Sequence, residues 1–272
     1  PPLRLNGGQP LVMARCSRLA RYSGSRRGYP VMAASQTAKK VVTLFGVLAT
    51  FVLFGLPLFF GLTSQDLNND EAIYSYAVDR MLEGENWLTP RSSPQTEFPG
   101  DPETHAGVFF EKPPLKFWIV ALPIQLGLLP HDEFGLRFWD ALFGAVAFVY
   151  VFLIGRRLVD PLCGLAAVFL LFINGSLLFN HGLRDTVMEA PLFLAYTGGM
   201  YHFLAWSESD RRSDRWRHII AFAGWFTLGF MTKFVAAIFL PMVVGVTALC
   251  LPDWRRRLRA DRWRWIAGAL SS

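Results

Sequence analysis

The chain has 272 residues, of which 52% are hydrophobic and 15% aromatic, and its formal net charge is +6. With a mean hydropathy of +0.29, it is too apolar for an ordinary soluble domain and fits the membrane class. Its three cysteines, Cys16, Cys163 and Cys250, are far apart in the sequence, which argues against a disulfide framework or a cysteine metal site.

The first 38 residues are rich in Arg, Ser and Gly and show no apolar periodicity. We expect residues 1–38 to form a disordered basic segment. Met32 is a candidate start of translation, which would make residues 1–31 non-native. A cleaved signal peptide over 32–62 is the competing interpretation, but its apolar run exceeds the about 7–15 residues of a signal-peptide core. An uncleaved anchor is therefore favoured.

Six apolar runs follow, and most are long enough for a spanning helix of about 20 residues. A seventh begins at Trp263 and is cut off at Ser272. Because a helix cannot stop within the bilayer, residues 39–272 are expected to be the N-terminal part of a larger transmembrane domain. The six runs are 41–62, 138–155, 162–179, 187–206, 218–232 and 234–251.

Basic residues gather in alternate connections between these runs. The positive-inside rule places those connections and the N-terminus in the cytoplasm. The segments 63–133, 180–186 and 231–234 then lie on the extracytoplasmic side. This distribution explains the positive charge without a nucleic-acid partner. The basic clusters are Arg26, Arg27, Lys39 and Lys40; Arg156 and Arg157; Arg211, Arg212, Arg215 and Arg217; and Arg255, Arg256, Arg257 and Arg259.

The outer segment 63–133 is acidic and is expected to contain two surface elements. Asn69 or Asp70 can cap a helix in which Ile73, Ala77 and Met81 recur at four-residue spacing, which gives an amphipathic element suited to the membrane surface. The apolar stretch 113–129 suits an interfacial or re-entrant helix at least as well as a span, and treating it as a span would place the later Arg clusters outside.

Ionisable residues from distant parts of the chain meet on this outer face. Independent accidents would not place all of these residues on one face. Cations here are contrary to the positive-inside rule, so we expect anionic partners for them. Pairing with Glu111, Glu189 or Asp185 is one possibility, and a phosphate group of a lipid ligand is the other. The positions are Asp70 and Glu71, Glu111 and Lys112, Arg137, Arg184 and Asp185, Glu189, and Lys233.

Each position taken alone also has a purely structural interpretation. Asp70 can serve as an N-cap, Lys116 can extend its ammonium toward the interface, and Lys233 can be an ordinary turn cation. Arg184 and Asp185 can form a local salt bridge worth about 0–1 kcal/mol if exposed. The five histidines share no metal-ligand spacing.

Several short motifs follow one another along the outer segments. They are Asp70-Glu71-Ala72-Ile73-Tyr74, Met81-Leu82-Glu83-Gly84, Trp87-Leu88-Thr89-Pro90-Arg91, Glu111-Lys112-Pro113-Pro114-Leu115 with Trp118, Arg184 with Glu189 and Pro191, and Thr232-Lys233. In this order they resemble the motifs of the C-type membrane glycosyltransferases, particularly the bacterial lipid A aminoarabinose transferases and the protein O-mannosyltransferase-like enzymes. The resemblance covers about residues 40–251. Glu189 stands where relatives more often have Asp, and Phe234 stands where Gly usually follows the Thr-Lys pair.

The resemblance implies an all-α polytopic bundle in a bacterial inner membrane, with amphipathic juxtamembrane helices in the outer loop. It implies inverting transfer of a sugar from a polyprenyl-phosphate donor to a lipid A-like or protein acceptor on the extracytoplasmic face. Asp70 is implied as the base, with Glu71 and Glu189 as further acidic residues. Glu111 is implied as a ligand of a divalent cation. The implied ligands of the donor phosphate are Lys112, Lys233, Arg184 and Arg137.

Two other classes compete with this interpretation. A transporter or flippase for lipid-linked sugars would use the same charges to hold phosphate, but it favours ionisable residues near the midplane, and the runs 41–62 and 162–179 contain none. In a non-catalytic membrane subunit the outer charges would only be solvated, and they would be dispersed rather than gathered.

Overall fold

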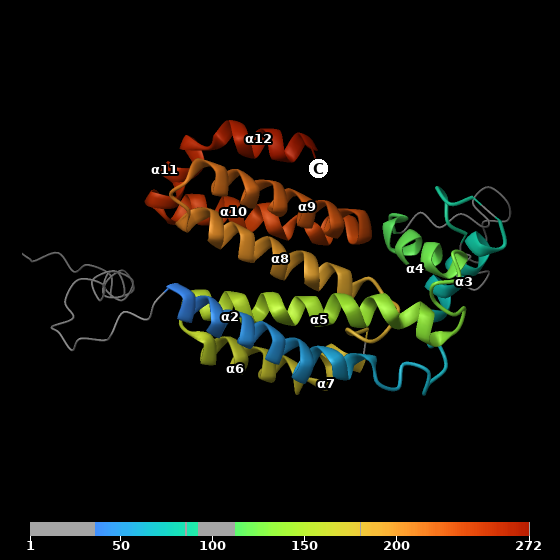
Figure 1. The fold of residues 1–272 in the computed structure, drawn as a ribbon. Coiled ribbons are helices and arrows are strands. Elements are labelled where there is room, and N and C mark those ends of the chain that lie inside the picture. The colour runs from blue at the N-terminus through green and yellow to red at the C-terminus, as the bar shows by residue number, and fades with distance from the viewer. Residues whose placement is uncertain (1–35, 85, 92–111, 180, 272) are drawn as a thin grey trace, which may run out of the picture. The chain divides into compact units, whose positions relative to one another are not determined.

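The computed structural model describes residues 36–84, 86–91, 112–179 and 181–271 (Figure 1). Every regular element within these ranges is helical, so the expected all-α fold is confirmed. The chain divides into two units, Pro1–Val41 and Val42–Ser272, and the packing below lies within the second. The expected disorder of residues 1–38 falls almost wholly outside the described ranges. The elements are α2 (Gln36–Thr50), the π-helical turn η1 (Phe51–Gly55), the 3-10 turn η2 (Leu56–Phe59), α3 (Asp70–Leu82), α4 (Leu115–Gln125), α5 (Glu133–Leu158), α6 (Pro161–Phe172), α7 (Gly175–Phe179), α8 (Glu189–Glu208), α9 (Arg212–Ala237), α10 (Phe239–Cys250), α11 (Pro252–Ala260) and α12 (Arg262–Ser271).

Aspartate side chains cap the N-termini of α5 and α6. The Asp132 carboxylate accepts the Gly135 N–H at 3.0 Å, and Asp160 accepts the Cys163 N–H at 2.8 Å. These bonds satisfy N–H groups that have no acceptor inside the helix. Pro161 follows the second cap, at a position where its missing N–H costs nothing. The chain therefore leaves α5 and enters α6 in a sharp turn.

Among the described residues, three helical stretches are long and apolar enough to cross a membrane: Thr37–Phe59, α5 and α9. The chain is thus a multi-pass membrane protein, although α6 and α10 are shorter than the expected runs. A single span over 162–179 is wrong, because α6 ends at Phe172 and α7 begins after Asn174. The Asn174-Gly175 pair is a common turn signal, which accounts for the interruption.

The helix α4 confirms that 113–129 is not a full span. It has 11 residues, which at about 1.5 Å per residue cover roughly half of a hydrocarbon core about 30 Å thick.

The helix α5 is the centre of the bundle (Figure 1). It packs against η1, α6 and α8, and α8 packs in turn against α9. The contact between α5 and α6 is a backbone contact, because a Cβ added at Gly155 would lie 2.6 Å from the Cα of Gly164. Small residues allow this approach where helices meet in a membrane.

The helices α3 and α4 pack on each other at the end of the bundle where α5 begins (Figure 1). Ala77 and Met81 of α3 are buried with Phe117 and Val120 of α4, so the apolar face of the predicted amphipathic helix packs on a neighbouring helix, where the sequence had suggested the membrane surface. The predicted cap is only partly right. Asn69 occupies the N-cap position, but with φ of 45° it departs from the usual cap conformation and makes no side-chain capping bond.

Candidate functional site

The ionisable residues expected on one face do gather at the α3–α4 end of the bundle, in two groups. The first group joins the start of α3, the start of α5 and the segment 181–187. The second is an ion pair between the start of α8 and a break in α9. Glu111 lies outside the described residues, so its expected role in a metal site stays a prediction.

Glu71 and Arg137 form a buried, bidentate ion pair in the first group. Nε and Nη2 of Arg137 each donate to one Glu71 carboxylate oxygen at 2.8 Å. Nη1 donates to the carbonyls of Leu62 and Gln65 at 2.6 and 2.7 Å, and Nη2 to that of Asp66 at 3.1 Å. All five guanidinium N–H groups therefore have acceptors within the protein.

Both carboxylate oxygens of Glu71 also accept hydrogen bonds from the backbone. Its Oε1 accepts the backbone N–H of Thr186 at 2.9 Å, and Oε2 accepts that of Asn68 at 3.4 Å. Burial alone would raise the pKa of this carboxyl, but the hydrogen bonds and charge of Arg137, with the two backbone N–H groups, lower it below its ordinary value. Glu71 is thus an ionised carboxylate that fixes 62–71 and 186 to α5.

Asp70 is the first residue of α3 and is far more open than its neighbour. Its carboxylate is 46% exposed and lies 3.7 Å from the Nδ1 of His181. The Tyr74 hydroxyl donates to it at the long distance of 3.5 Å. Asp70 therefore keeps most of its acceptor capacity for a ligand or a proton.

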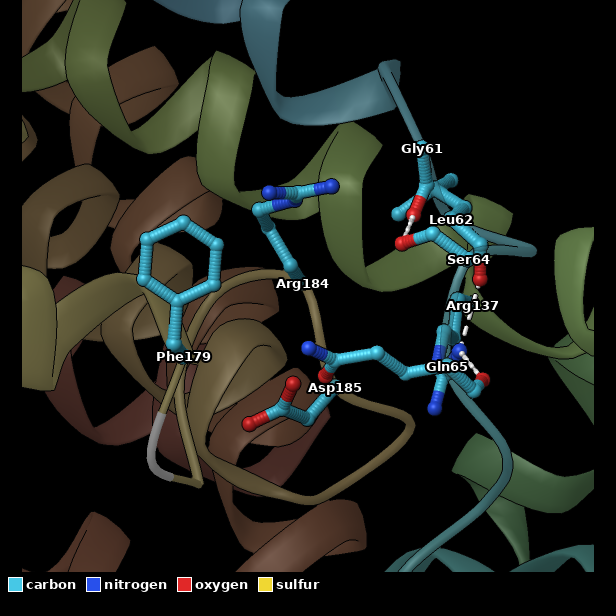
Figure 2. A pocket seen from close by; sticks show the side chains of 8 residues that line it. All are labelled: Gly61, Leu62, Ser64, Gln65, Arg137, Phe179, Arg184 and Asp185. Atoms are coloured by element: carbon cyan, nitrogen blue, oxygen red, sulfur yellow. Dashed lines mark hydrogen bonds between the residues drawn. The ribbon is translucent and has the colours of Figure 1, made fainter.

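Arg184 and Asp185 border a small polar cavity of about 50 Å³ between the segments 61–65 and 179–185 (Figure 2). The Arg184 guanidinium donates to the carbonyls of Leu58, at 3.2 Å, and Phe60, and lies 4.9 Å from the ring centre of Phe179. Among the described residues, the hydrogen-bond acceptors of Arg184 are neutral carbonyls, and the nearby Asp185 carboxylate, which also borders the cavity, interacts with its charge through space.

A second recess of about 270 Å³ adjoins the first and shares Gln65, Phe179 and Asp185 with it. Its other walls include Asn68 and His181, so it opens beside Asp70. Burial raises the pKa of the Asp185 carboxyl, although the Gly182 N–H donates to it. Figure 2 shows the Gln65 side chain reaching toward Asp185 across the smaller cavity.

Lys233 and Glu189 make up the second group, with Nζ and Oε1 2.6 Å apart. The helical conformation of α9 is interrupted at Lys233 and Phe234, which confirms the predicted turn near 231–234. Both side chains are just over one third exposed. Lys112 is half-buried at the entry to Pro113, upstream of α4.

Sequence reasoning missed Asp140, which is fully buried in α5 and forms an ion pair with Lys116 of α4. The purely structural interpretation of Lys116, with its ammonium extended toward the interface, is wrong, because only 2% of the residue is exposed. Its Nζ also donates to the carbonyl of Val187 at 3.3 Å. The signal was present in the sequence, because an acidic residue inside an apolar run needs a partner.

Within the described part of the chain, no three His, Cys, Asp or Glu side chains gather as metal ligands would. The chemistry available there is that of carboxylates, guanidinium and ammonium groups around polar recesses.

Residues 111–271, more than half of the chain, match the family model described as dolichyl-phosphate-mannose-protein mannosyltransferase. An uncharacterized protein of Aquifex aeolicus is 26% identical over 74% of this chain and 36% of its own length. The undecaprenyl phosphate-alpha-4-amino-4-deoxy-L-arabinose arabinosyl transferase of Pseudomonas savastanoi pv. phaseolicola is 27% identical over 78% of this chain and 36% of its own. The protein of the same name in Pseudomonas aeruginosa strain LESB58 is 28% identical over 73% of this chain and 32% of its own length.

The chain therefore spans about a third of the length of these curated relatives. Among solved structures, the archaeal oligosaccharyltransferase AglB from Archaeoglobus fulgidus, in complex with an inhibitory peptide and a dolichol-phosphate, has a similar fold. The TM-score is 0.57 at 15% identity, over 77% of this chain and 26% of that one. These findings confirm the resemblance to C-type membrane glycosyltransferases, and by the extent of its match the chain belongs to the dolichyl-phosphate-mannose-protein mannosyltransferase family.

Proposed function

We propose that this chain forms part of a membrane glycosyltransferase that moves a sugar from a polyprenyl-phosphate donor to a lipid A-like or protein acceptor. The observation that carries the proposal is the contrast between two adjacent carboxylates. Glu71 lines a polar recess of about 270 Å³, but its carboxylate is only 7% exposed and is held by Arg137 and two backbone N–H groups. The Asp70 carboxylate is 46% exposed and lies next to His181, which lines the same recess. Of the two carboxylates, that of Asp70 is therefore the more accessible to a substrate.

In this proposal Asp70 is the general base. It takes the proton of the acceptor hydroxyl as that oxygen forms its bond to the anomeric carbon, and the bond from that carbon to the phosphate oxygen breaks. The electron pair leaves with the polyprenyl phosphate, and attack from the opposite side inverts the anomeric carbon. If the acceptor is an already anionic lipid phosphate, Asp70 orients it rather than deprotonating it.

The leaving phosphate requires cations near its developing charge. Arg184 is proposed for this role because its known acceptors are neutral carbonyls and it borders the smaller cavity. Lys233 and Lys112 are proposed as further ligands, with Glu189 holding Lys233 in place. Arg137 and Glu71 are proposed as positioning residues, since every N–H group of Arg137 is already used within the protein.

The charge of the larger recess suggests which sugars it accepts. Asp185 borders it and Asp70 lies beside it, while Glu71 is neutralised by Arg137. A sugar with an ammonium group would pair with these carboxylates, which agrees with the amino-arabinose in the relatives' printed names. We therefore propose an amino sugar as the transferred group, with the reaction on the extracytoplasmic face of the bacterial inner membrane and the N-terminus in the cytoplasm.

The test uses the full-length protein in lipid vesicles with an undecaprenyl-phosphate-linked aminopentose and either lipid A or a hydroxyl-bearing peptide as acceptor. We expect sugar transfer to one acceptor, loss of transfer in Asp70→Asn, and normal membrane insertion of that variant. Asp79→Asn is the matched control, because Asp79 lies on the same helix, its side chain is 41% exposed, and it pairs with the exposed His131 rather than with a residue of the site. Wild-type turnover in Asp70→Asn would remove Asp70 from the mechanism, and donor translocation without transfer would favour a transporter.

A further inference from the structure

The second buried ion pair at this end of the bundle, between Lys116 and Asp140, has the same architecture as the first with its charges reversed. The helix α5 contributes a cation at Arg137 and an anion at Asp140, three residues later and on nearly the same side of the helix. The α3 carboxylate of Glu71 meets the first, and the α4 ammonium of Lys116 meets the second. Two helices of the outer segment are thereby attached to one turn of α5.

Both outer partners also hold consecutive residues of the segment that carries Arg184 and Asp185. Glu71 accepts the N–H of Thr186 at 2.9 Å, and Lys116 donates to the carbonyl of Val187 at 3.3 Å. The backbone of this segment is therefore held at its N–H side by a charge from α3 and at its carbonyl side by a charge from α4.

The Lys116–Asp140 pair is costly for a merely structural contact. Lys116 is 2% exposed and Asp140 is fully buried, and burying two charges consumes most of what their attraction returns. The second carboxylate oxygen of Asp140, Oδ1, has no partner among the described residues. An apolar pair of similar size would pack here at least as well, but it would not hold the Val187 carbonyl.

We infer that Lys116 and Asp140 are positioning residues: the ion pair fixes the segment 181–187, and through it places Arg184 and Asp185 at the two recesses. That the ion pair fixes this segment follows from the contacts alone. That the fixed segment serves catalysis rests on the proposed transferase function.

The test replaces the pair by apolar residues in the full-length protein, as Lys116→Met with Asp140→Leu, so that neither charge is left buried without a partner. The matched control is Arg157→Met with Glu208→Leu, which removes an exposed ion pair between α5 and α8 that involves no residue of the site. One readout is the mobility of a nitroxide at His181→Cys, in a background without the native cysteines. The other is transfer by unlabelled protein, resolved into kcat and donor KM.

We expect the protein with the apolar pair to unfold at or above the wild-type temperature, and its nitroxide to become mobile. We expect its kcat to fall by up to about 100-fold, which is the loss that misplacement by about 1 Å can produce. The change in donor KM should be smaller. The control should change neither readout. An immobile nitroxide in the folded variant would overturn the inference, whether or not transfer is measured. A mobile nitroxide together with a wild-type kcat would overturn the inference that this positioning serves catalysis. If the wild-type protein itself transfers no sugar, the proposed function is contradicted, and the nitroxide mobility alone then tests whether the ion pair fixes the segment 181–187.

Discussion

Glu71 and Arg137 are 66 positions apart in the sequence and share two parallel hydrogen bonds of 2.8 Å. The pair joins the first turn of α3 to the first part of α5, and both side chains are at most 7% exposed. Because the remaining N–H groups of Arg137 hold three backbone carbonyls of the segment 62–66, the conformation leading to Asp70 depends on this one guanidinium.

Glu71→Gln is expected to lower the free energy of unfolding by about 3–5 kcal/mol, because it leaves the buried Arg137 charge without its counterion. Thermal or denaturant unfolding in detergent measures the change. Glu208→Gln is the control, since the exposed Arg157–Glu208 pair should contribute less than about 1 kcal/mol. Equal effects of the two substitutions would show that burial of the Glu71 pair adds nothing.

Stability should also depend on pH through Glu71. The fold lowers the pKa of this carboxyl below its ordinary 4.5, so the ionised form is favoured more in the folded than in the unfolded chain. Its contribution is therefore present above pH 4.5 and is lost as the pH falls through the lower folded-state pKa. Unfolding measured across this acidic range should show the loss in wild type, and Glu71→Gln should flatten it.

Asp185 should change the stability with pH in the opposite direction to Glu71. Burial raises the pKa of its carboxyl, so protonation is favoured more in the folded chain and this group should add stability on acidification. Asp185→Asn removes that gain, and the acid loss of stability should then be steeper than in wild type. Identical pH profiles for wild type, Glu71→Gln and Asp185→Asn would contradict both assignments.

The gathering of distant charges at one end of the bundle was predictable from the sequence. Alternate basic loops set the topology, and the topology placed Asp70, Arg184 and Lys233 at one end. The partners were not predictable. Glu189 was one of three acidic candidates for pairing with the outer cations, and the structure pairs it with Lys233. Spacing alone could not select it, nor show that Glu71 would pair with Arg137, because such contacts depend on how α3 and the start of α8 pack against other helices.

Two features were missed although the sequence contained a signal for them. Asp140 stands inside an apolar run, where an ionisable residue requires a partner, and Lys116 supplies it from α4. The interruption after α6 was marked by Asn174-Gly175, which was counted as part of one run because its neighbours are apolar. In both cases the average hydropathy of the run gave too little weight to one or two residues whose chemistry determines the local structure.

Lys233→Ala is expected to raise the donor KM by about 10- to 100-fold, the range for loss of a charge-assisted hydrogen bond. Its pairing with Glu189 is just over one third exposed, so the accompanying loss of stability should stay below about 1 kcal/mol. Steady-state transfer at varied donor concentration gives KM. Arg217→Ala, which removes an 81% exposed cation from the same helix, is the control. An unchanged donor KM would leave Lys233 with only an ion-pairing role.

The α5–α6 contact makes a prediction that is independent of function. A Cβ at Gly164 would lie 2.4 Å from the Phe152 carbonyl oxygen and 3.1 Å from the Arg156 nitrogen, both backbone atoms of α5. Because backbone atoms cannot rotate away as a side chain can, Gly164→Ala must push the helices apart and should cost about 1–3 kcal/mol. Gly245→Ala on α10 meets nothing within 4 Å and should stabilise the helix by roughly 0.5–1 kcal/mol. Unfolding of both variants in the same detergent compares them directly, and a stable Gly164→Ala would mean that α5 and α6 pack less closely than the structure has them.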